Sequence, residues 1–430
     1  MSRRFIHKPI EDDFNNKLIE WLGGQEVSFC FKGHGWGAHC NASFDLYAGA
    51  AIHSMPSRFN EYAEFIESAN DFIFTAIPYD FKNKLEDLKS DNIDEVGFVD
   101  PVIFIPQITF KILKSNLTVG FLPEYNTKEE VDQLIDKIKN LIPKSIGIAS
   151  KSRTPKQRMN RDSYLERIKT CKQHLTQGDI YQANICQEFY WSDCQLYGPE
   201  VFTRGFESNP NPFSVYFKHK HIHCLSWSPE RFLSVCDRQI MSQPMKGTAP
   251  RGNTPKEDER LKDLLRKSEK DRRENVMIVD MVRNDLSAHA TKGSVNVSDL
   301  YTIETYPRVH QMHSTVTAKI KQGSRLLDAL VAAFPMASMT GAPKIRAMEI
   351  IENLEVTKRG LFSGTIGFFT PEKNADFNVI IRSLIYNENR GHLSCHVGGG
   401  ITDLSNPEAE YEECLTKVSP ILDLVNALHH

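Results

Sequence analysis

A chain of 430 residues is long enough for two or three domains with a large buried core. Its composition, 40% hydrophobic and 25% charged, is ordinary for a globular protein. The net charge of -3 lacks the basic excess typical of proteins that bind nucleic acids or membrane surfaces, and so argues against both classes.

The nine cysteines are scattered and form no CxxC pair, and Cys186 and Cys194 are not spaced like zinc ligands. We therefore expect free thiols in a reducing compartment. The N-terminal stretch MSRRFIHKPIEDDF has two arginines but no apolar segment, unlike a secretory signal. No window approaches the roughly 18 apolar residues of a membrane span. These features predict a soluble, cytoplasmic protein.

Compact β-branched and aromatic runs predict strands in residues 1 to about 145. A basic, polar stretch at 143–162 has few large apolar side chains and is the best candidate for a linker. We therefore divide the chain into regions 1–150 and 160–425, and expect the two to intertwine in one globule. The predicted strands are VSFCF (27–31), DFIFTAI (71–77), VIFIP (102–106) and ITFKI (108–112).

Beyond residue 160, predicted strands alternate with longer helices. Amphipathic spacing predicts helices over 163–179, 257–287, 342–355 and 407–428. Many strand-like runs follow one another through short turns, which favours antiparallel pairing. We expect an α+β or layered α/β fold, not a doubly wound parallel sheet. The runs lie at 213–219, 221–227, 231–236, 364–370, 377–387 and 392–397.

The stretch SQPMKGTAPRG (242–252) places Lys246 between two prolines and two glycines. Prolines and glycines at these positions predict a stiff turn. The common explanation of a lysine in a loop is a solvated surface side chain. The alternative is an ammonium group held in a fixed place, and the pattern alone leaves both open.

A carboxylate is directed toward apolar side chains in the helix predicted over 257–287. Glu274 shares its stripe with Ile278, and a carboxylate so placed is costly unless it meets a cation or a metal. The alternative is a glutamate at the helix edge that snorkels beside Arg272 and Arg273.

The last predicted helix begins with LSNPEAEYEE (404–413), in which Ser405 and Glu408 fit a capping box. Glu410, Glu413 and Lys417 follow at spacing i, i+3, i+7. Two carboxylates one turn apart suit a hard divalent cation. Solvated acids on a helix edge are the commoner explanation of this spacing.

Three glycines, Gly398 to Gly400, come at the end of a predicted strand. Glycines allow backbone N–H groups to form a concavity that binds an anion. The alternative is a strand end whose unusual dihedral angles only glycine adopts readily. Upstream, Arg382 lies in the apolar strand predicted over 377–387. A guanidinium there needs a carboxylate from the protein or from a substrate.

Seven segments occur in the order seen in the chorismate-utilising enzymes, and over roughly residues 155 to 420 the chain is identified as similar to that family. The resemblance implies two antiparallel sheets packed face to face with helices outside, an α/β/β/α layering with the active site between the sheets. The segments are PMKGTAPRG, RENVMIVDMVRNDLS, YPRVHQMHSTV, SMTGAPKIRAMEIIENLE, GTIGFF, IRSL and GGGITDLSNPEAEYEECL.

The resemblance also implies a cofactor and a substrate, Mg²⁺ and chorismate. Glu274 and Glu413 match the metal carboxylates of the family, and Glu410 sits beside them. Arg382 and the glycines 398–400 match positions that hold substrate carboxylates. Bound Mg²⁺ would chelate the ring carboxylate and withdraw electron density from the diene.

Two positions indicate which branch of the family the chain resembles. Gln182 stands where the branches that add water carry a lysine, and an amide cannot act as that base. Lys246 lies in PMKGT, similar to the PIKGT of the branch that makes 4-amino-4-deoxychorismate, whereas the anthranilate branch resembles PIAGT. The resemblance makes Lys246 a nucleophile at C2 of chorismate, with Thr248 of the same motif among the substrate-binding residues.

The leaving hydroxyl of chorismate needs an acid, and Glu230 in SWSPERF matches the candidate of the family. We expect apolar neighbours such as Trp227 to raise the pKa of Glu230 toward neutrality. The chain departs from the family at Gln311, where many relatives have a histidine. We assign no catalytic role to His310 or His313 beside it.

None of the cysteines lies in a GxCxGxQ-type elbow, the signature of a glutamine amidotransferase. The resemblance therefore implies a separate amidotransferase subunit that supplies ammonia, with a heterodimer as the expected assembly. The alternatives are the anthranilate-forming branch and, in another class, a catalytically inert binding or regulatory homologue.

Overall fold

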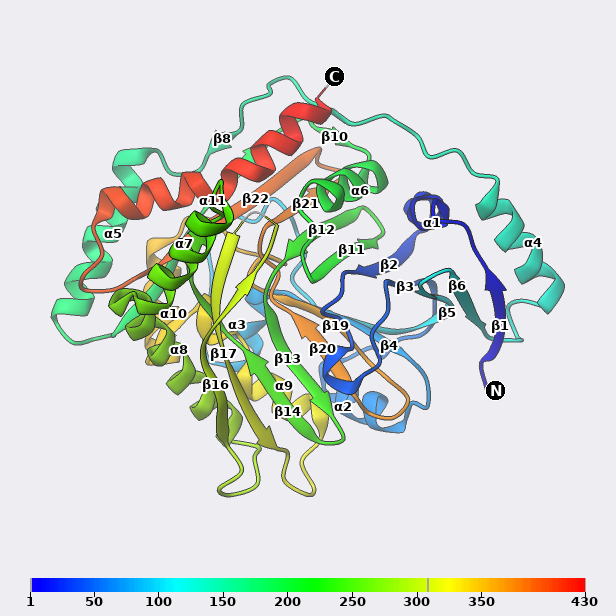
Figure 1. The fold of residues 1–430 in the computed structure, drawn as a ribbon, viewed down its shortest axis with the longest axis horizontal. Coiled ribbons are helices and arrows are strands. Elements are labelled where there is room, and N and C mark those ends of the chain that lie inside the picture. The colour runs from blue at the N-terminus through cyan, green and yellow to red at the C-terminus, as the bar shows by residue number, and fades with distance from the viewer. Residues whose placement is uncertain (1, 308, 430) are drawn as a thin grey trace.

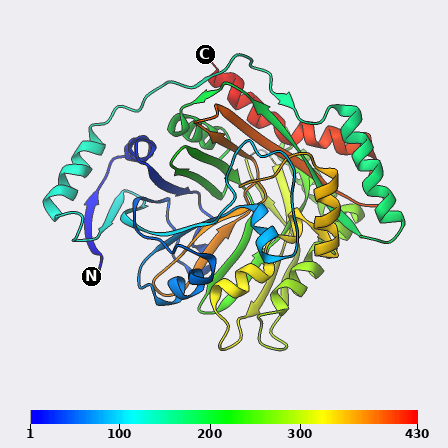
Figure 2. The same ribbon diagram turned by 180° about the vertical axis from the view of Figure 1, so that it is seen from behind.

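Two antiparallel β-sheets pack face to face, with helices outside them, in the computed structural model, which describes residues 2–307 and 309–429 (Figures 1 and 2). This confirms the predicted layered α+β architecture. The helices are α1 (Phe14–Gly23), α2 (Phe59–Ser68), α3 (Lys82–Leu85), α4 (Lys128–Lys139), α5 (Arg161–Thr176), α6 (Gly198–Ser208), α7 (Pro255–Lys267), α8 (Glu269–Ser287), α9 (Leu326–Ala333), α10 (Lys344–Leu354) and α11 (Pro407–Leu428).

Sheet A runs in the order β9, β22, β21, β12, β11, β2, β3, β5, β6, β1, with β8 and β18 paired to the outer edge of β9. Strands from both ends of the chain are therefore neighbours in it. Its strands are β1 (Arg4–Pro9), β2 (Val27–Lys32), β3 (Leu46–Ser54), β5 (Val102–Leu113), β6 (Asn116–Phe121), β8 (Lys156–Gln157), β9 (Gln182–Trp191), β11 (Phe213–His219), β12 (Ile222–Ser228), β18 (Gly341–Ala342), β21 (Ser383–Asn387) and β22 (His392–Ile401).

Sheet B runs in the order β16, β17, β14, β13, β20, β19, β4, β5, and β15 also pairs with β17. The long strand β5 belongs to both sheets and joins the two predicted runs 102–106 and 108–112. The remaining strands of sheet B are β4 (Ile73–Ile77), β13 (Arg231–Cys236), β14 (Gln239–Gln243), β15 (Met245–Pro250), β16 (Asn296–Thr305), β17 (Val309–Lys319), β19 (Thr365–Phe369) and β20 (Ala375–Asn378).

Buried side chains form two hydrophobic clusters, one for each face of sheet A. The first joins both sheets with α2, α8 and α9, and within it Phe29 of β2 stacks on Phe74 of β4 with ring centroids 4.6 Å apart. The second lies between the other face of sheet A and helices that include α1, α5 and α11. Burial of such side chains from both sheets is the main force that presses the layers together.

One predicted helix is divided in the structure, and one predicted helix cap is wrong. The helix predicted over 257–287 is two helices, because Ser268 leaves the helical conformation and its hydroxyl caps α8 by accepting from the N–H of Asp271. The predicted capping box at Ser405 and Glu408 is wrong, since Asn406 caps α11 and accepts from the N–H of Ala409.

The predicted linker at 143–162 connects α4 to α5 along the upper edge of the molecule in Figure 1. It is anchored on the way by β7 (Ile148–Ala149), which pairs with β10 (Gln195–Leu196), and by β8. Pairs such as β2 with β11 and β4 with β19 cross from one predicted region to the other.

The expectation of free thiols throughout is wrong at one pair, because Cys40 and Cys236 form a disulfide across a separation of 196 residues. No local spacing pattern could reveal so distant a pair. The other cysteines are free and buried: Cys30, Cys171, Cys186, Cys194, Cys224, Cys395 and Cys414.

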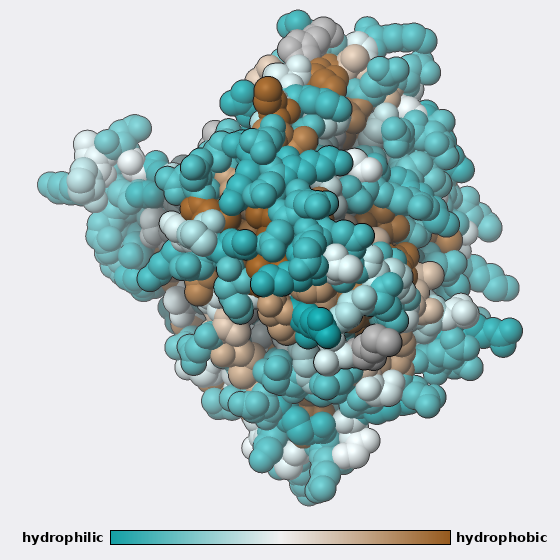
Figure 3. All heavy atoms as spheres, turned by 90° about the vertical axis from the view of Figure 1, so that its right-hand side faces the viewer, coloured by the Kyte–Doolittle hydropathy of each residue, from teal (hydrophilic) through white to brown (hydrophobic). Residues whose placement is uncertain are grey.

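The face beside β1 and α4 is mainly hydrophilic, with hydrophobic side chains in small separate groups (Figure 3). Within the described residues, every helix is too short or too polar to cross a membrane.

Candidate active site

Lys246 lies on a strand rather than in the predicted turn. It belongs to β15, whose pairing with β17 is irregular between Met245 and Thr248. Lys246 and Gly247 occupy this bulge, and Gly247 takes a positive φ of 91° that favours glycine. A bulge changes the direction in which the side chains of its strand point. Lys246 lies in the bulge and is half-buried.

The ammonium of Lys246 reaches from sheet B to β22 of sheet A. A Cβ atom built on Gly400 would lie 2.7 Å from Nζ of Lys246 and 3.0 Å from Nε2 of Gln182. The three groups therefore meet at one point between the two sheets. The glycines 398–400 do not end their strand as expected, but stay paired with residues 186–184 of β9. What they provide is room for side chains that approach from elsewhere.

Gln182, at the start of β9, is buried with 1% of its surface exposed. Among the described residues neither its amide nitrogen nor its amide oxygen has a hydrogen-bond partner. An unpaired buried amide costs about 1–3 kcal/mol, so its position is better explained by a ligand that completes its hydrogen bonds. Its place among the substrate-binding residues stays a prediction.

Burial lowers the pKa of the Lys246 ammonium, and the positive charge of Lys417 lowers it further, against the opposing effects of Glu274, Glu413 and Glu230. A lysine becomes nucleophilic only as the neutral amine. The surroundings of Lys246 therefore favour the form needed for nucleophilic attack.

Glu230 lies between β12 and β13 and is 5% exposed. Burial raises its pKa to about 7, although Ser338 and Lys246 favour its charged form. A carboxyl group that is partly protonated at neutral pH is suited to act as a general acid. Trp227 is not one of the apolar neighbours that raise the pKa of Glu230, as was predicted. Its side chain faces α6 on the other side of sheet A, where Nε1 donates to the carbonyl of Phe202. The apolar walls beside Glu230 are Phe232, Leu233, Val282, Met336 and Val379.

Arg382 is not inside a strand as predicted, because the run 377–387 breaks between β20 and β21. Its φ of 50° is unusual for a residue with a side chain. In the described part of the chain, the Arg382 guanidinium makes no hydrogen bond or ion pair. Burial lowers the pKa of Arg382, and the neighbouring Tyr306 and Glu230 oppose this effect. We still expect the Arg382 guanidinium to bind a carboxylate that this chain does not supply.

Three carboxylates predicted as metal ligands come from two helices. Glu274 is on α8, and Glu410 and Glu413 are on α11. Burial raises the pKa values of Glu274 and Glu410, and the negative charge of Glu410 adds to the effect on Glu274. Oε2 of Glu410 points at Gly399, 2.9 Å from where a Cβ would be. Repulsion between buried carboxylates is the situation that a divalent cation relieves.

Lysines engage two of these carboxylates. Nζ of Lys417 lies 2.6 Å from Oε1 of Glu413 and donates to the carbonyl of Gly398 at 2.8 Å. Nζ of Lys270 lies 3.9 Å from Oε1 of Glu274. Across residues 2–307 and 309–429, no three His, Cys, Asp or Glu side chains are grouped closely enough to hold a metal. Carboxylate oxygens are ligands of the kind that Mg²⁺ prefers, and Glu413 is occupied by Lys417 in this structure.

The remaining predicted residues lie on β15 and β17. Thr248 is exposed and stands opposite Gln311. His310 is buried and bridges Thr305 and Asp258, each at 2.9 Å. These two contacts hold the His310 ring between β16 and α7.

Two residues near this site, Lys417 and Ser338, were not predicted from the sequence to have a role there. The spacing of Glu413 and Lys417, i and i+4 on a helix, is a known signal for an ion pair and could have found the first. Ser338 lies in the 3-10 turn Ala337–Met339, and nothing in its local sequence points to Glu230.

Substitution of Gly400 by alanine should displace Lys246 without unfolding the chain. The new Cβ would meet the far ends of two side chains, Lys246 at 2.7 Å and Gln182 at 3.0 Å, and no backbone atom, so the thermal stability should change little. Misplacing a reacting group by about 1 Å costs on the order of 100-fold in rate. Steady-state turnover and melting temperature would be compared with those of Gly24→Ala, whose Cβ meets only the Trp21 carbonyl at 3.4 Å. Unchanged turnover would mean that Lys246 does not work from this position.

A family model described as chorismate binding enzyme matches residues 21–423. The chain is 42% identical over 271 residues to a protein of Streptomyces griseus named aminodeoxychorismate synthase, covering 63% of this chain and 37% of that one. It is 41% identical over 266 residues to aminodeoxychorismate synthase component 1 of Escherichia coli (strain K12), covering 61% and 58% of the two chains. The aligned part thus spans less than two thirds of the length of each of these relatives.

The fold is also that of a solved structure described as MenF, the menaquinone-specific isochorismate synthase from Escherichia coli. The TM-score is 0.79 at 15% identity, over 99% of this chain and 95% of that chain. At this identity the similarity concerns the arrangement of the sheets and helices and not the reaction.

Proposed function

The chain belongs to the family of chorismate binding enzymes, and on that premise we propose that it is an aminodeoxychorismate synthase component I. It would convert chorismate and ammonia into 4-amino-4-deoxychorismate. The observation that carries the proposal is Lys246, whose ammonium reaches across the sheets to Gly400 and Gln182. The two relatives that bear this enzyme name support the same branch.

Lys246 would act as the nucleophile. Its neutral amine adds to C2 of chorismate, the two ring double bonds shift, and the C–O bond at C4 breaks. Glu230 gives its proton to the leaving hydroxyl, which departs as water and leaves Glu230 as a carboxylate. Ammonia then adds to C4, the double bonds shift back, and the C2–N bond breaks to release Lys246 as a neutral amine. The new ammonium group at C4 gives a proton to the Glu230 carboxylate, which yields 4-amino-4-deoxychorismate and restores the acid. The raised pKa of Glu230 supports its role as the acid, and the lowered pKa of Lys246 supports its role as a neutral amine.

Substrate recognition would rest on charge and on unpaired polar groups. The Arg382 guanidinium would bind a carboxylate of chorismate, and the backbone of Gly398 to Gly400 would allow close approach of the ring. Gln182 would complete its hydrogen bonds on the substrate, and Thr248 would contact it from β15. Because an amide is not a base, Gln182 disfavours the addition of water to the ring.

Mg²⁺ would be held by Glu274 and Glu413, with Glu410 beside them. When bound, the ion would neutralise the ring carboxylate and draw electron density from the diene. Glu410 is directed toward Gly399 rather than toward solvent, which keeps its charge near the ion. The lysine partners of Glu274 and Glu413 would balance their charges in the absence of the ion.

Mixing the purified chain with chorismate, Mg²⁺ and an ammonium salt tests the proposal, with products read by mass spectrometry. We expect 4-amino-4-deoxychorismate. Anthranilate with pyruvate would assign the chain to the other aminating branch, a hydrated isomer would mean that Gln182 does not exclude water, and unchanged chorismate would indicate an inert homologue.

Ammonia would come from a partner, a separate subunit that hydrolyses glutamine, in a heterodimer. Free ammonia is scarce at neutral pH because the pKa of ammonium is about two units higher, close to that of an amine. The cysteines of this chain lie outside amidotransferase motifs. The product would then pass to a separate lyase on the route to 4-aminobenzoate and folate.

The source of ammonia gives a clear expectation for the purified chain. It should be inactive with glutamine alone, active with ammonium at raised pH, and active with glutamine once the partner subunit is added. Product formation would be followed for each mixture. Strong activity of the chain alone with glutamine would contradict the assignment of glutamine hydrolysis to a partner.

A further inference from the structure

The first turns of α8 lie directly against the strand that carries the proposed nucleophile. Gly247 is in the same bulge as Lys246, and a Cβ atom built on it would lie only 3.0 Å from the Cβ atom of Asp271 on α8. A larger residue could not come so close without displacing its neighbour, so glycine allows this approach. Glu274 follows Asp271 about one turn later along α8. The bulge of β15 and the start of α8 are therefore in contact.

A buried serine of β17 joins these two elements by hydrogen bonds. The backbone N–H of Ser314 donates to the carbonyl of Pro244, two residues before Lys246, at 3.2 Å. The Ser314 hydroxyl donates to Oδ1 of Asn275, the residue that follows Glu274 on α8. Ser314 and Asn275 are 0% and 1% exposed, so water does not compete for this bond. One residue thus connects the strand of Lys246 with the helix of Glu274.

Tyr301 of β16 adds a second connection to α8. It lies where the pairing of β16 with β17 is irregular, and its φ of 59° is unusual for a residue with a side chain. Its N–H donates to Oγ of Ser314 at 3.2 Å, and its ring centroid lies 4.5 Å from Cζ of Arg272 on α8. Arg272 and Asn275 come before and after Glu274 in the sequence. The strands therefore hold the helix on either side of this carboxylate.

The Glu274 carboxylate depends on this support because it has little of its own. Among the described residues it makes no hydrogen bond, and its ion pair with Lys270 spans 3.9 Å. A partly exposed pair at that distance restrains a side chain weakly. Glu274 and Lys246 are close enough to interact, since burial lowers the pKa of Lys246 and the charge of Glu274 opposes this effect. The place of the carboxylate relative to the amine therefore follows from where α8 lies.

We propose that Ser314 is a positioning residue of the reaction, which sets the place of the Glu274 carboxylate relative to the Lys246 amine by fixing α8 to β15. The roles of Lys246 and Glu274 rest on the proposed function, whereas the connection between the two elements does not. Apolar side chains such as Ile278 and Val279 also press α8 onto the sheet, but apolar contacts have no preferred direction. The hydrogen bond from Ser314 is directional and fixes the helix at one atom.

The hydroxyl can be removed while the backbone of β17 stays as it is. In Ser314→Ala the backbone bond to Pro244 remains, and the bond to Asn275 is lost. Asn275→Leu removes the same bond from the side of the helix and leaves no unpaired buried amide. The matched control is Ser28→Ala on β2, where a serine that is 0% exposed donates to the carbonyl of Leu22 at 2.9 Å. This control removes an equally buried hydroxyl bond that belongs to neither β15 nor α8.

Three measurements separate positioning from stability: calorimetric titration with Mg²⁺ alone, steady-state turnover with ammonium, and the melting temperature. All three single variants should melt below wild type. Ser314→Ala and Asn275→Leu should also bind Mg²⁺ about threefold more weakly and turn over about tenfold more slowly, because a shift of a fraction of an ångström at a reacting group is costly in rate. Ser28→Ala should keep the wild-type values of both. The double variant of Ser314 and Asn275 should match Ser314→Ala, because both changes break one bond.

Wild-type Mg²⁺ affinity and turnover in Ser314→Ala would overturn the inference. Additive losses in the double variant, or equal losses of affinity and turnover in Ser28→Ala, would overturn it as well. If the wild-type chain does not aminate chorismate, the proposed function fails, while the Mg²⁺ titration still decides whether Ser314 places Glu274. If wild type aminates chorismate and Ser314→Ala does so equally well, the inference fails alone.

Discussion

Lys246→Ala is expected to lower the formation of 4-amino-4-deoxychorismate by about 1,000-fold or more, because without the nucleophile the covalent route is closed. The variant should fold, because the side chain is only half-buried and packs in a bulge of β15. Slow direct amination of the ring could persist, as the carboxylates and Arg382 remain.

The measurement is the turnover with ammonium, together with the mass of the wild-type protein after exposure to chorismate without ammonia. An adduct should appear on wild type and be absent from the variant. Lys256→Ala, an exposed lysine on α7, is the control and should behave as wild type. If Lys246→Ala turns over at the wild-type rate, the nucleophile is another group.

The protonation of Lys246 gives this variant a pH signature. A neutral amine exists only above its pKa, so wild-type activity should rise with pH through that value. Burial lowers the pKa of Lys246, which brings the rise to a lower pH than for an exposed lysine. The residual activity of Lys246→Ala should lack this limb, which separates a lost nucleophile from a general loss of binding.

Local patterns in the sequence were sufficient for the elements that depend on them. The apolar spacing of 407–428 predicted α11 with its observed bounds, and the runs 213–219 and 231–236 are strands β11 and β13 as predicted. Period and composition fix such elements because the buried face of each repeats at the period of its own secondary structure.

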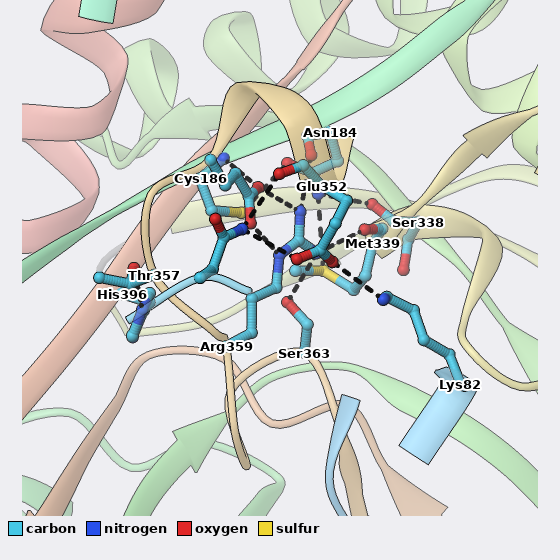
Figure 4. A network of polar contacts seen from close by, with 12 residues as sticks. Lys82, Asn184, Cys186, Ser338, Met339, Glu352, Thr357, Arg359, Ser363 and His396 are labelled. Carbon is cyan, nitrogen blue, oxygen red and sulfur yellow. Dashed lines mark hydrogen bonds and ion pairs between the residues drawn. The ribbon is translucent and has the colours of Figure 1, made fainter. Parts of the chain in front are cut away.

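Features set by tertiary contacts could not be predicted in this way. The side of sheet A that Trp227 faces depends on the packing of α6, and Arg382 lies at a break that the apolar run around it conceals. The carbonyl groups of Ser338 and Met339 accept hydrogen bonds from Asn184 and Arg359, which are distant from them in sequence (Figure 4). The convergence of Lys246 on Gly400 likewise exists only once the two sheets are packed.

Glu274→Gln and Glu413→Gln are each expected to weaken Mg²⁺ binding about tenfold or more, and to abolish measurable turnover. Mg²⁺ prefers charged oxygen ligands, and each substitution keeps the shape of the side chain while it removes one negative charge. The fold should survive, because Glu413 is 46% exposed and Glu274 is 17% exposed at the side chain.

Calorimetric titration with Mg²⁺ alone would measure the affinity, so that binding is judged apart from activity. Glu412→Gln, an exposed neighbour on α11, is the matched control and should bind Mg²⁺ as wild type does. Glu413→Gln also breaks the pair with Lys417, which frees that lysine beside Lys246. Full activity of the wild-type chain in excess EDTA would refute the metal requirement, and unchanged affinity in both variants would place the ion elsewhere.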